Sequence, residues 1–394
     1  MTFFILDKMT LVHPTPDMRA FIREELREPE NQADIDKDIA AIREWLKTQP
    51  HLPKDMDDQR LCTFLRGCKF SLEKVKRKLD MYYTMRNAVP EFFANRDMSR
   101  PELNLVMDYV HFPPLPGLTP NGRRVTFIRA IDCDFQPSQV NDAMKVALML
   151  GDIRLAEEQG IAGDIFILDA SVATAAHFAK FSPTVVKKFL IAVQEAYPVK
   201  VKEVHVINIS PLVDTIMNFV RPFVKEKIRN RIHFHSDMDS LFKFVPKTML
   251  PSEYGGNAGS IMELNDQWRQ KLKDYTEWFK TQENSKANEA LRPGSPKTAD
   301  DLFGMEGTFR QTYFWLYLHK FIHLTMCGYL IYINSIFFFY FRFILFCLLC
   351  SLRSEIKDET KNRNILILSH LIQVNPNLLE QQLRFFFIFL SGPG

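Results

Sequence analysis

Little in this 394-residue sequence suggests a disulfide-rich, polycationic or metal-dependent protein. Its six cysteines form no disulfide framework. The one CxxC-like spacing, Cys347 to Cys350, lies in an apolar run without a second pair, so a zinc site is not expected. The formal net charge is only +3, which excludes a global polycation and makes a nucleic-acid partner unexpected. Any binding of anions must therefore be local.

Motifs of catalysis and nucleotide binding are also missing. The sequence contains no GxSxG elbow, no GxxxxGK[ST] loop and no GxGxxG after a strand. His233 and His235 lie two residues apart, but no third residue stands at metal-ligand spacing. Asp169 has only His177 as a nearby partner for acid–base chemistry. We therefore expect no catalytic residue, no metal and no cofactor.

The N-terminal stretch MTFFILDKMTLVHP is too short in its apolar part for a secretory signal peptide. Its apolar core has four residues and is interrupted by Asp7. We expect a reduced, cytosolic compartment, with the protein peripheral at membranes.

The chain from residue 34 to about residue 95 has the pattern of a small helical unit. Ile35, Ile39, Ile42 and Leu46 recur at three- and four-residue spacing between charged residues, which predicts a helix over 34–47. Two further helices follow, one ending near Gly67 and one beginning after Ser71 as its N-cap. The unit ends near residue 95, and the Pro-rich stretch 111–122 predicts a loop at the domain boundary.

From residue 123 onward, strands alternate with helices. Strands are predicted over 125–131, 165–171 and 201–209, and helices over 138–159 and from Ser182 to 196. Residues 233–235 predict an edge strand. Continuous apolar strands separated by helices are typical of a mostly parallel sheet covered by helices. The predicted fold class is therefore α/β, preceded by a small N-terminal all-α domain.

The segment 197–256 combines an apolar surface with a basic one. It opens with the strand-like YPVKVKEVHVINIS, and residues 211–237 predict a helix that is apolar at one end and basic at the other. It closes with the turn LPSEYGG. Apolar surface and positive charge on one element indicate a protein that handles an apolar ligand at an anionic membrane surface.

Several motifs in this order resemble the CRAL-TRIO (Sec14-like) family. They are YPVKVKEVHVIN, RPFVKEKIRNRIHFH and LPSEYGG, with DDQRLCTFLRGCKFSLEKVKRKLDMYY upstream. Within the family they are most similar to the branch of tocopherol transfer protein, retinaldehyde-binding protein and clavesin. The segment FGMEGTFRQ is similar to the end of insect-type members. The resemblance covers residues 34–311 and implies a monomeric lipid-binding protein with a mobile helical gate.

The resemblance also implies a site. Matching positions in the similar transfer proteins bind the phosphates of phosphoinositides, and here they are Arg66, Lys200, Lys202, Arg221, Lys227, Arg229 and Arg231. A solvated basic face is the alternative for this set. By rough correspondence, the walls of a lipid cavity are predicted at Val146, Leu150, Ile167, Phe189, Val193, Val201, Ile216, Phe219 and Phe223. Ordinary core packing is the alternative for these residues.

Two functions follow from the resemblance. One is an intracellular carrier that binds a hydrophobic small-molecule lipid, such as tocopherol or a retinoid, and docks on phosphoinositide membranes through a basic gate. The other is a module that senses phosphoinositides for membrane recruitment without moving cargo. The sequence does not name the lipid, since several classes suit an apolar cavity.

The predicted domains are a lead over 1–33, a helical domain over 34–110, a lipid-binding domain over 111–282, a flexible segment over 283–311 and an atypical tail over 312–394. Residues 312–352 contain no Asp or Glu, and residues 329–352 are long enough to span a bilayer, for which about 20 apolar residues suffice. Two interpretations of this tail stay open. One is a tail anchor, in which Arg342 costs about 2.5–3.5 kcal/mol. The favoured one is translated intron, because AT-rich codons encode most of the enriched residue types.

Overall fold

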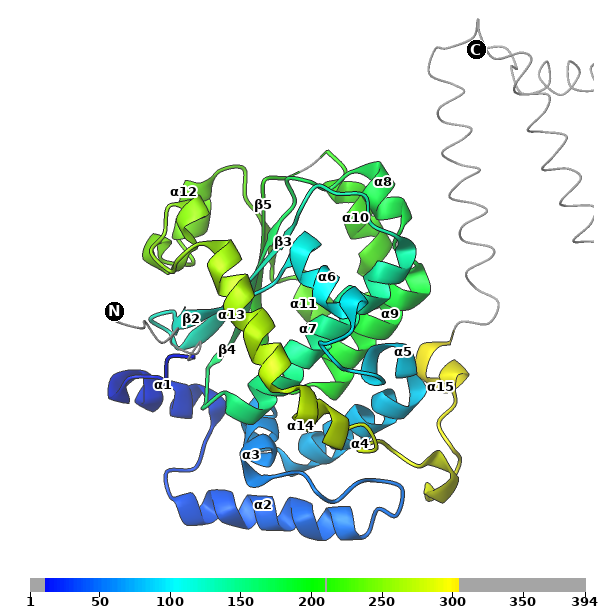
Figure 1. Cartoon of the computed structure of the whole chain (residues 1–394). Coiled ribbons are helices and arrows are strands. Elements are labelled where there is room, and N and C mark those ends of the chain that lie inside the picture. The colour runs from blue at the N-terminus through cyan, green and yellow to red at the C-terminus, as the bar shows by residue number, and fades with distance from the viewer. Residues whose placement is uncertain (1–10, 210, 305–394) are drawn as a thin grey trace, which may run out of the picture. The chain divides into compact units, whose positions relative to one another are not determined.

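A computed structural model describes residues 11–209 and 211–304 of the chain (Figure 1). The predicted fold class is confirmed, because an all-α domain precedes a helix-covered sheet. The helices of the first part are α1 (Pro16–Leu26), α2 (Gln32–Lys47), α3 (Asp58–Gly67), α4 (Leu72–Ala88), α5 (Pro90–Phe93) and α6 (Pro101–Tyr109).

Local sequence explains where these helices begin. The side chains of Thr15, Asn31 and Asp57 accept hydrogen bonds from backbone N–H groups of the first turns of α1, α2 and α3. The predicted apolar stripe of α2 is buried, with Ile42 and Leu46 at 0% and 1% exposure. These side chains pack with α3 and α4 into the core of the helical domain.

The sheet has strands β1 (Val110–His111), β2 (Pro114–Leu118), β3 (Arg123–Ala130), β4 (Gly163–Asp169), β5 (Val201–Ile207) and β6 (Ile232–Phe234). Strands β3, β4, β5 and β6 are parallel, and β1 and β2 pair antiparallel with β3. The sequence therefore predicted the parallel strands correctly, including the edge strand β6. The Pro-rich stretch 111–122 was wrongly predicted to be only a loop, because an edge strand such as β2 tolerates proline.

The helices of the α/β domain begin with α7 (Pro137–Glu157), α8 (Ala175–Ala179) and α9 (Pro183–Ile191), which continues as the π-helical turn η1 (Ala192–Ala196). The next elements are α10 (Val213–Val220), the 3-10 turn η2 (Arg221–Phe223) and α11 (Glu226–Arg229). The domain ends with α12 (Met238–Phe242), the 3-10 turns η3 (Lys247–Met249) and η4 (Ser252–Tyr254), α13 (Ile261–Asp274) and α14 (Thr276–Thr281).

The prediction of one continuous helix over 211–237 is wrong. The structure divides it into α10, η2 and α11, and the chain is extended at Val224. Pro222 explains the break, because proline has no backbone N–H and its ring clashes with the preceding helical turn. Residues 232–234 then form β6 instead of continuing the helix.

Residues 283–304 pack against the helical domain, where the sequence predicted a flexible segment. The 3-10 turn η5 (Glu289–Leu291) and α15 (Ala299–Phe303) lie in this stretch. Ala287 N donates to Tyr83 O at 3.0 Å, and Asn288 N donates to His51 O at 2.8 Å. Phe303 is buried in the helical-domain core. The polar composition of residues 283–304 gives no sign of these backbone and core contacts.

Across residues 11–209 and 211–304, no helix is long and apolar enough to cross a membrane. The tail predicted to be either a membrane anchor or translated intron lies outside the described residues.

Candidate functional site: a basic cluster and an apolar gate

Three of the predicted phosphate-binding residues lie together at the junction of the two domains. Lys202 of β5 and Lys69, which follows α3, both donate to Glu25 Oε1, at 2.6 and 3.3 Å. Arg66 of α3 donates to Glu28 Oε1 through Nε at 3.0 Å and Nη2 at 2.7 Å. We name Arg66, Lys69, Lys200 and Lys202 the basic cluster. The sequence prediction missed Lys69, although it lies three residues after Arg66.

Lys200 is the exceptional member of the basic cluster. Its Nζ is buried and finds no hydrogen-bond acceptor among the described residues. Burial, followed by the charges of Lys202 and Lys69, lowers the pKa of Lys200 to about 8. An anionic ligand that reached this ammonium group would stabilise its charged form and supply the missing acceptor.

We name the segment α10–η2–α11 (residues 213–229) the gate, after the helical gate that the family resemblance implies. Of the remaining predicted cations, Arg221, Lys227 and Arg229 lie on its second half, and Arg231 follows it. Arg221 and Lys227 are exposed, and Arg229 Nη1 donates to Arg221 O at 3.1 Å. Arg231 Nη1 donates to Val201 O, the backbone carbonyl between Lys200 and Lys202. The gate cations are therefore a second group, which Arg231 joins to β5, the strand that carries Lys202.

The apolar half of the gate is α10. It is an apolar helix, and none of its eight residues is buried. Phe219 packs edge to face on Phe178 of α8, with ring centroids 4.9 Å apart. Gln194 of η1 fastens the end of the gate, since its Nε2 donates to Phe223 O at 2.9 Å and its Oε1 accepts from Lys225 N at 2.8 Å.

The two faces of the sheet differ in how completely they are covered. In-register neighbours of parallel strands share a face. On one face Phe127, Ile167 and His205 are neighbours, and each is fully buried. The rings of Tyr254 and Phe244 cover this face. The ring centroid of Tyr254 is 4.4 Å from that of Phe127, and the ring centroid of Phe244 is 5.0 Å from that of His205.

The other face keeps accessible apolar surface. Phe166 and Leu168 of β4 are half-buried, as is Val204, the neighbour of Phe166 on β5. Asp164 on this face pairs with Arg154 of α7 at 2.8 Å. In Figure 1, α8, α9 and α10 lie on one side of the sheet and α12 lies on the other. Val206, the neighbour of Leu168 on β5, is buried. Helices therefore stand over this face but leave Phe166, Leu168 and Val204 only half-buried.

The structure divides the predicted cavity residues into two groups. Val146, Leu150 and Ile167 are buried in the core cluster of the α/β domain, at 0%, 4% and 0% exposure. The other predicted wall residues are half-buried: Phe189, Val193, Val201, Ile216, Phe219 and Phe223. Phe166 and Leu168 were missed, because the run Ile165–Leu168 within β4 is apolar at every position and shows no alternation that would separate the faces.

The residues considered for catalysis are engaged elsewhere. Asp169 accepts hydrogen bonds from Tyr254 and from Asn208 Nδ2, the latter at 3.0 Å. His177 instead contacts backbone carbonyls, with Nδ1 2.8 Å from Val172 O. In residues 11–209 and 211–304, no three or more His, Cys, Asp or Glu side chains are arranged to hold a metal ion.

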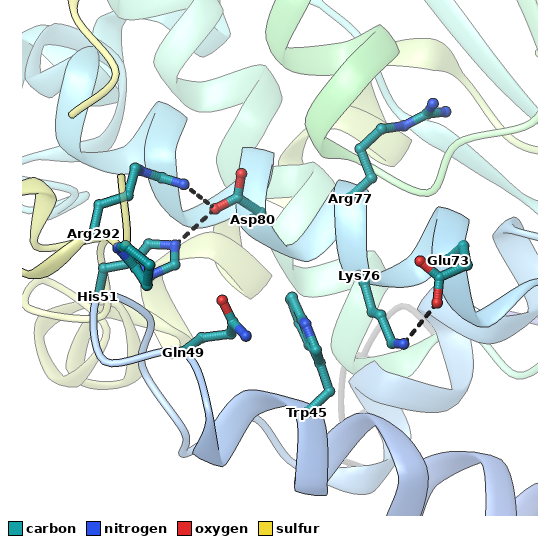
Figure 2. A pocket seen from close by; sticks show the side chains of 9 residues that line it. Trp45, Gln49, His51, Glu73, Lys76, Arg77, Asp80 and Arg292 are labelled. Atoms are coloured by element: carbon teal, nitrogen blue, oxygen red, sulfur yellow. Dashed lines mark hydrogen bonds and ion pairs between the residues drawn. The ribbon is translucent and has the colours of Figure 1, made fainter. Parts of the chain in front are cut away.

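A polar pocket of about 310 Å³ lies in the helical domain (Figure 2). Asp80 accepts from His51 Nε2 at 2.9 Å and from Arg292 Nη1 at 2.8 Å, and Lys76 donates to Glu73 at 2.6 Å. The charges of the pocket are thus largely paired with one another. They fasten the segment after α14 to α4 and form no part of the gate.

Comparison with known proteins identifies the family. Residues 31–103 match the family model described as Pinta-like, UBA domain, and residues 111–256 match the CRAL/TRIO domain. The alpha-tocopherol transfer protein-like protein of Mus musculus is 32% identical over 253 residues, which cover 63% of this chain and 72% of that protein. The chain belongs to the CRAL-TRIO family. The resemblance inferred from the sequence motifs is therefore confirmed.

Other CRAL-TRIO relatives extend the comparison. Clavesin-1 of Rattus norvegicus is 27% identical over 260 residues, covering 64% of this chain and 72% of that protein. The crystal structure of Sfh5 has a TM-score of 0.39 at 14% identity, and the match covers 60% of this chain and 92% of that chain. CRAL-TRIO proteins bind or transfer hydrophobic lipids, and membership gives this protein a role of that kind.

Proposed function

We propose that this CRAL-TRIO protein is an intracellular carrier of one hydrophobic lipid, such as tocopherol or a retinoid. The lipid would lie in an apolar cavity between β4–β5 and the helices α8 to α10. The protein would exchange it at membranes that contain phosphoinositides, with α10 as the gate and the cations of η2 and α11 as the docking surface.

The unequal coverage of the two sheet faces carries this proposal. One face is closed by Tyr254 and Phe244. On the other, Phe166 and Leu168 remain half-buried although apolar helices stand over them. Leaving apolar surface accessible forgoes about 25 cal/mol for each Å². An apolar ligand that filled the space would recover this free energy, which supports a cargo site.

The placement of charge supports docking at anionic membranes. Arg221 and Lys227 are exposed on the gate itself, next to the apolar helix. Each cation near an anionic membrane surface contributes about 1 kcal/mol of binding free energy. A protein of net charge +3 would thus dock by one face, the face that releases cargo.

Identification of the bound lipid tests the carrier proposal. We expect solvent extracts of the purified full-length protein to contain one lipid class in a one-to-one molar ratio, measured by mass spectrometry. Phe219→Asp should lower this ratio, because it places a charge on the apolar side of the gate, whereas Asn218→Asp on the exposed side should not. A folded, monomeric protein that carries and takes up no lipid of any class would refute the carrier.

A recruitment module is the second candidate. The exposed position of Arg221 and Lys227 favours it, since these residues could bind phosphoinositide with or without cargo. Transfer of a fluorescent lipid between donor and acceptor vesicles separates the two functions. A carrier accelerates transfer when phosphoinositide is in the acceptor, whereas a recruitment module binds the vesicles without transferring the lipid.

A further inference from the structure

The end of α1 places two carboxylates on the basic cluster. Glu25 lies in the last turn of α1 and accepts from Lys202 at 2.6 Å and from Lys69 at 3.3 Å. Glu28 follows the helix and accepts two hydrogen bonds from Arg66. Three of the four cations of the basic cluster are therefore already paired with acids from a segment that precedes both domains.

These contacts are those that a phosphate group would make. A carboxylate and a phosphate both accept hydrogen bonds from lysine and, in paired fashion, from arginine. The hydrogen bond from Lys202 lowers the pKa of Glu25 to about 2, so Glu25 is ionised at neutral pH. Lys200 receives no such partner among the described residues, although it directly precedes β5, which carries Lys202.

The apolar anchoring of α1 is small. Ile22 and Leu26 are buried against Ala162, and these three residues form a cluster separate from the two main cores. Met18 packs against this cluster from a half-buried position, and the exposed positions of α1 are polar except Pro16, Ala20 and Phe21. Ionic contacts with the basic cluster are thus a large part of what holds the end of α1.

The chain around these glutamates is built to turn. Arg27 has φ of +57°, in the left-handed region that side chains other than glycine seldom adopt, and it ends α1. On the other side of α1, Val12 N donates to Pro116 O at 3.0 Å. Displacement of Glu25 and Glu28 would accordingly be local, confined to the end of α1 and residues 27–31.

We propose that Glu25 and Glu28 are an internal competitor for phosphate groups at the basic cluster, which must be displaced before the cluster binds the anionic headgroup of a phosphoinositide. This inference rests on the proposed docking function and adds its regulation. In the closed state the acids mask the cluster, and only the gate cations face the membrane. Contact with a phosphoinositide then exchanges carboxylates for phosphates and exposes the full set of cations.

The first test compares two variants of equal charge. Glu25→Gln with Glu28→Gln removes the competing acids, and Asp17→Asn with Glu24→Gln removes two exposed acids of the same helix. Both add the same net positive charge. We expect the first variant to bind phosphatidylcholine vesicles containing phosphatidylinositol bisphosphate about tenfold more tightly than the second, because a masked site reduces apparent affinity by the fraction that is open.

The second test uses the unaltered full-length protein. Hydrogen exchange of the amides at residues 23–31 is measured alone, with phosphatidylcholine vesicles, with the same vesicles containing phosphatidylinositol bisphosphate, and with soluble inositol hexakisphosphate. We expect exchange to accelerate about fivefold or more when the phosphates bind, since the end of α1 then opens. Acceleration by the soluble compound assigns the effect to phosphates alone. Acceleration only by vesicles assigns it to a headgroup held in a bilayer.

The outcomes separate the regulation from the function. If both variants bind the vesicles equally and exchange at residues 23–31 does not change on binding, the glutamates are structural and the inference is overturned while docking stands. If neither variant nor the unaltered protein binds phosphoinositide vesicles above phosphatidylcholine alone, the proposed docking function fails, and the competitor fails with it.

Discussion

Tyr82 of the helical domain and Tyr197 of the α/β domain donate their hydroxyl groups to the same atom, Asp152 Oδ1, at 2.9 and 2.7 Å. Their rings also pack edge to face, with centroids 5.5 Å apart. Arg86 and Arg96 bind the other oxygen of this carboxylate, at 2.9 and 2.6 Å. Because Tyr197 opens the segment that leads into β5, this buried network fixes the position of the basic cluster between the domains.

Removing the charge at the centre of this network should destabilise the whole protein. Asp152→Asn would leave two fully buried arginines without a counterion, which costs about 3–5 kcal/mol. Glu24→Gln, an exposed change of the same charge, should stay within about 0.5 kcal/mol. Urea unfolding followed by circular dichroism measures both. An unchanged midpoint for Asp152→Asn would show that the ion network does not join the domains.

The gate cations should control vesicle binding. Arg221→Ala with Lys227→Ala should weaken binding to phosphoinositide vesicles by about 2 kcal/mol, or about 30-fold. Lys54→Ala with Lys273→Ala removes two exposed charges elsewhere and is the control. Co-sedimentation with vesicles measures the affinity. Arg231 is left in place because its hydrogen bond to Val201 O also supports the backbone.

Salt provides a second measure of the same prediction. Binding by exposed cations should weaken as salt rises, because the Debye length falls to about 3 Å at 1 M. Equal binding by the gate variant and its control at low salt would return these residues to the simpler interpretation of a solvated basic face.

Two neighbouring residues on β4 offer a matched test of the cavity. Leu168→Phe adds volume on the half-buried face. If this face lines the proposed cavity, the larger side chain should lower lipid occupancy with little change in stability. Ile167→Phe adds volume on the fully buried face and should cost about 1–3 kcal/mol. Lipid occupancy by mass spectrometry and thermal unfolding are measured together. The cavity assignment fails if Leu168→Phe destabilises as much as Ile167→Phe and leaves cargo unchanged.

Acid should destabilise the fold through His235. His205 Nδ1 and His235 Nε2 lie 2.9 Å apart, and both side chains are buried. Burial, followed by the nearby His205 and His233, lowers the pKa of His235 from its ordinary value of 6.5. The unfolded chain therefore binds more protons than the folded one, and stability present above about pH 6.5 declines as the pH falls below it.

Denaturation midpoints from pH 8 to pH 5 check this sign. His235→Gln should flatten the decline relative to the unaltered protein, because it removes the titrating group. His13→Gln, at an exposed position before α1, should leave the decline as it is. A decline of the same slope in all three proteins would assign the acid sensitivity to other groups.

Sequence periodicity predicted the elements better than it predicted their surroundings. The stripe from Ile35 to Leu46 predicted a helix correctly, because burial on a helix repeats about every 3.6 residues. The apolar runs at Ile165 and Val201 predicted strands correctly, because short continuous apolar runs between helices are typical of a parallel sheet. The break at Pro222 could have been foreseen from proline alone. The faces of β4 could not, because an apolar run gives both faces the same composition.

The sequence predicted only part of the candidate site. The family resemblance implied one set of seven cations, of which the structure brings Arg66, Lys200 and Lys202 together and leaves the others on or just after the gate. The motifs gave no reason to expect Glu25 and Glu28 there, because a contact across about 40 residues or more between a leading helix and a strand leaves no local pattern. The packing of residues 283–304 escaped prediction for the same reason, since hydrogen bonds from backbone atoms do not depend on side-chain type.

The break at Pro222 has a consequence for depth in the bilayer. A straight, continuous helix has a single tilt. Immersing its apolar half in acyl chains would therefore pull the adjoining cations below the phosphates, and keeping the cations at the phosphates would lift the apolar half out. The interruption between α10 and α11 gives each half its own inclination. On the proposed docking mode, Phe219 can enter the hydrocarbon while Lys227 stays at headgroup level, so that a proline sets the immersion limit of the gate.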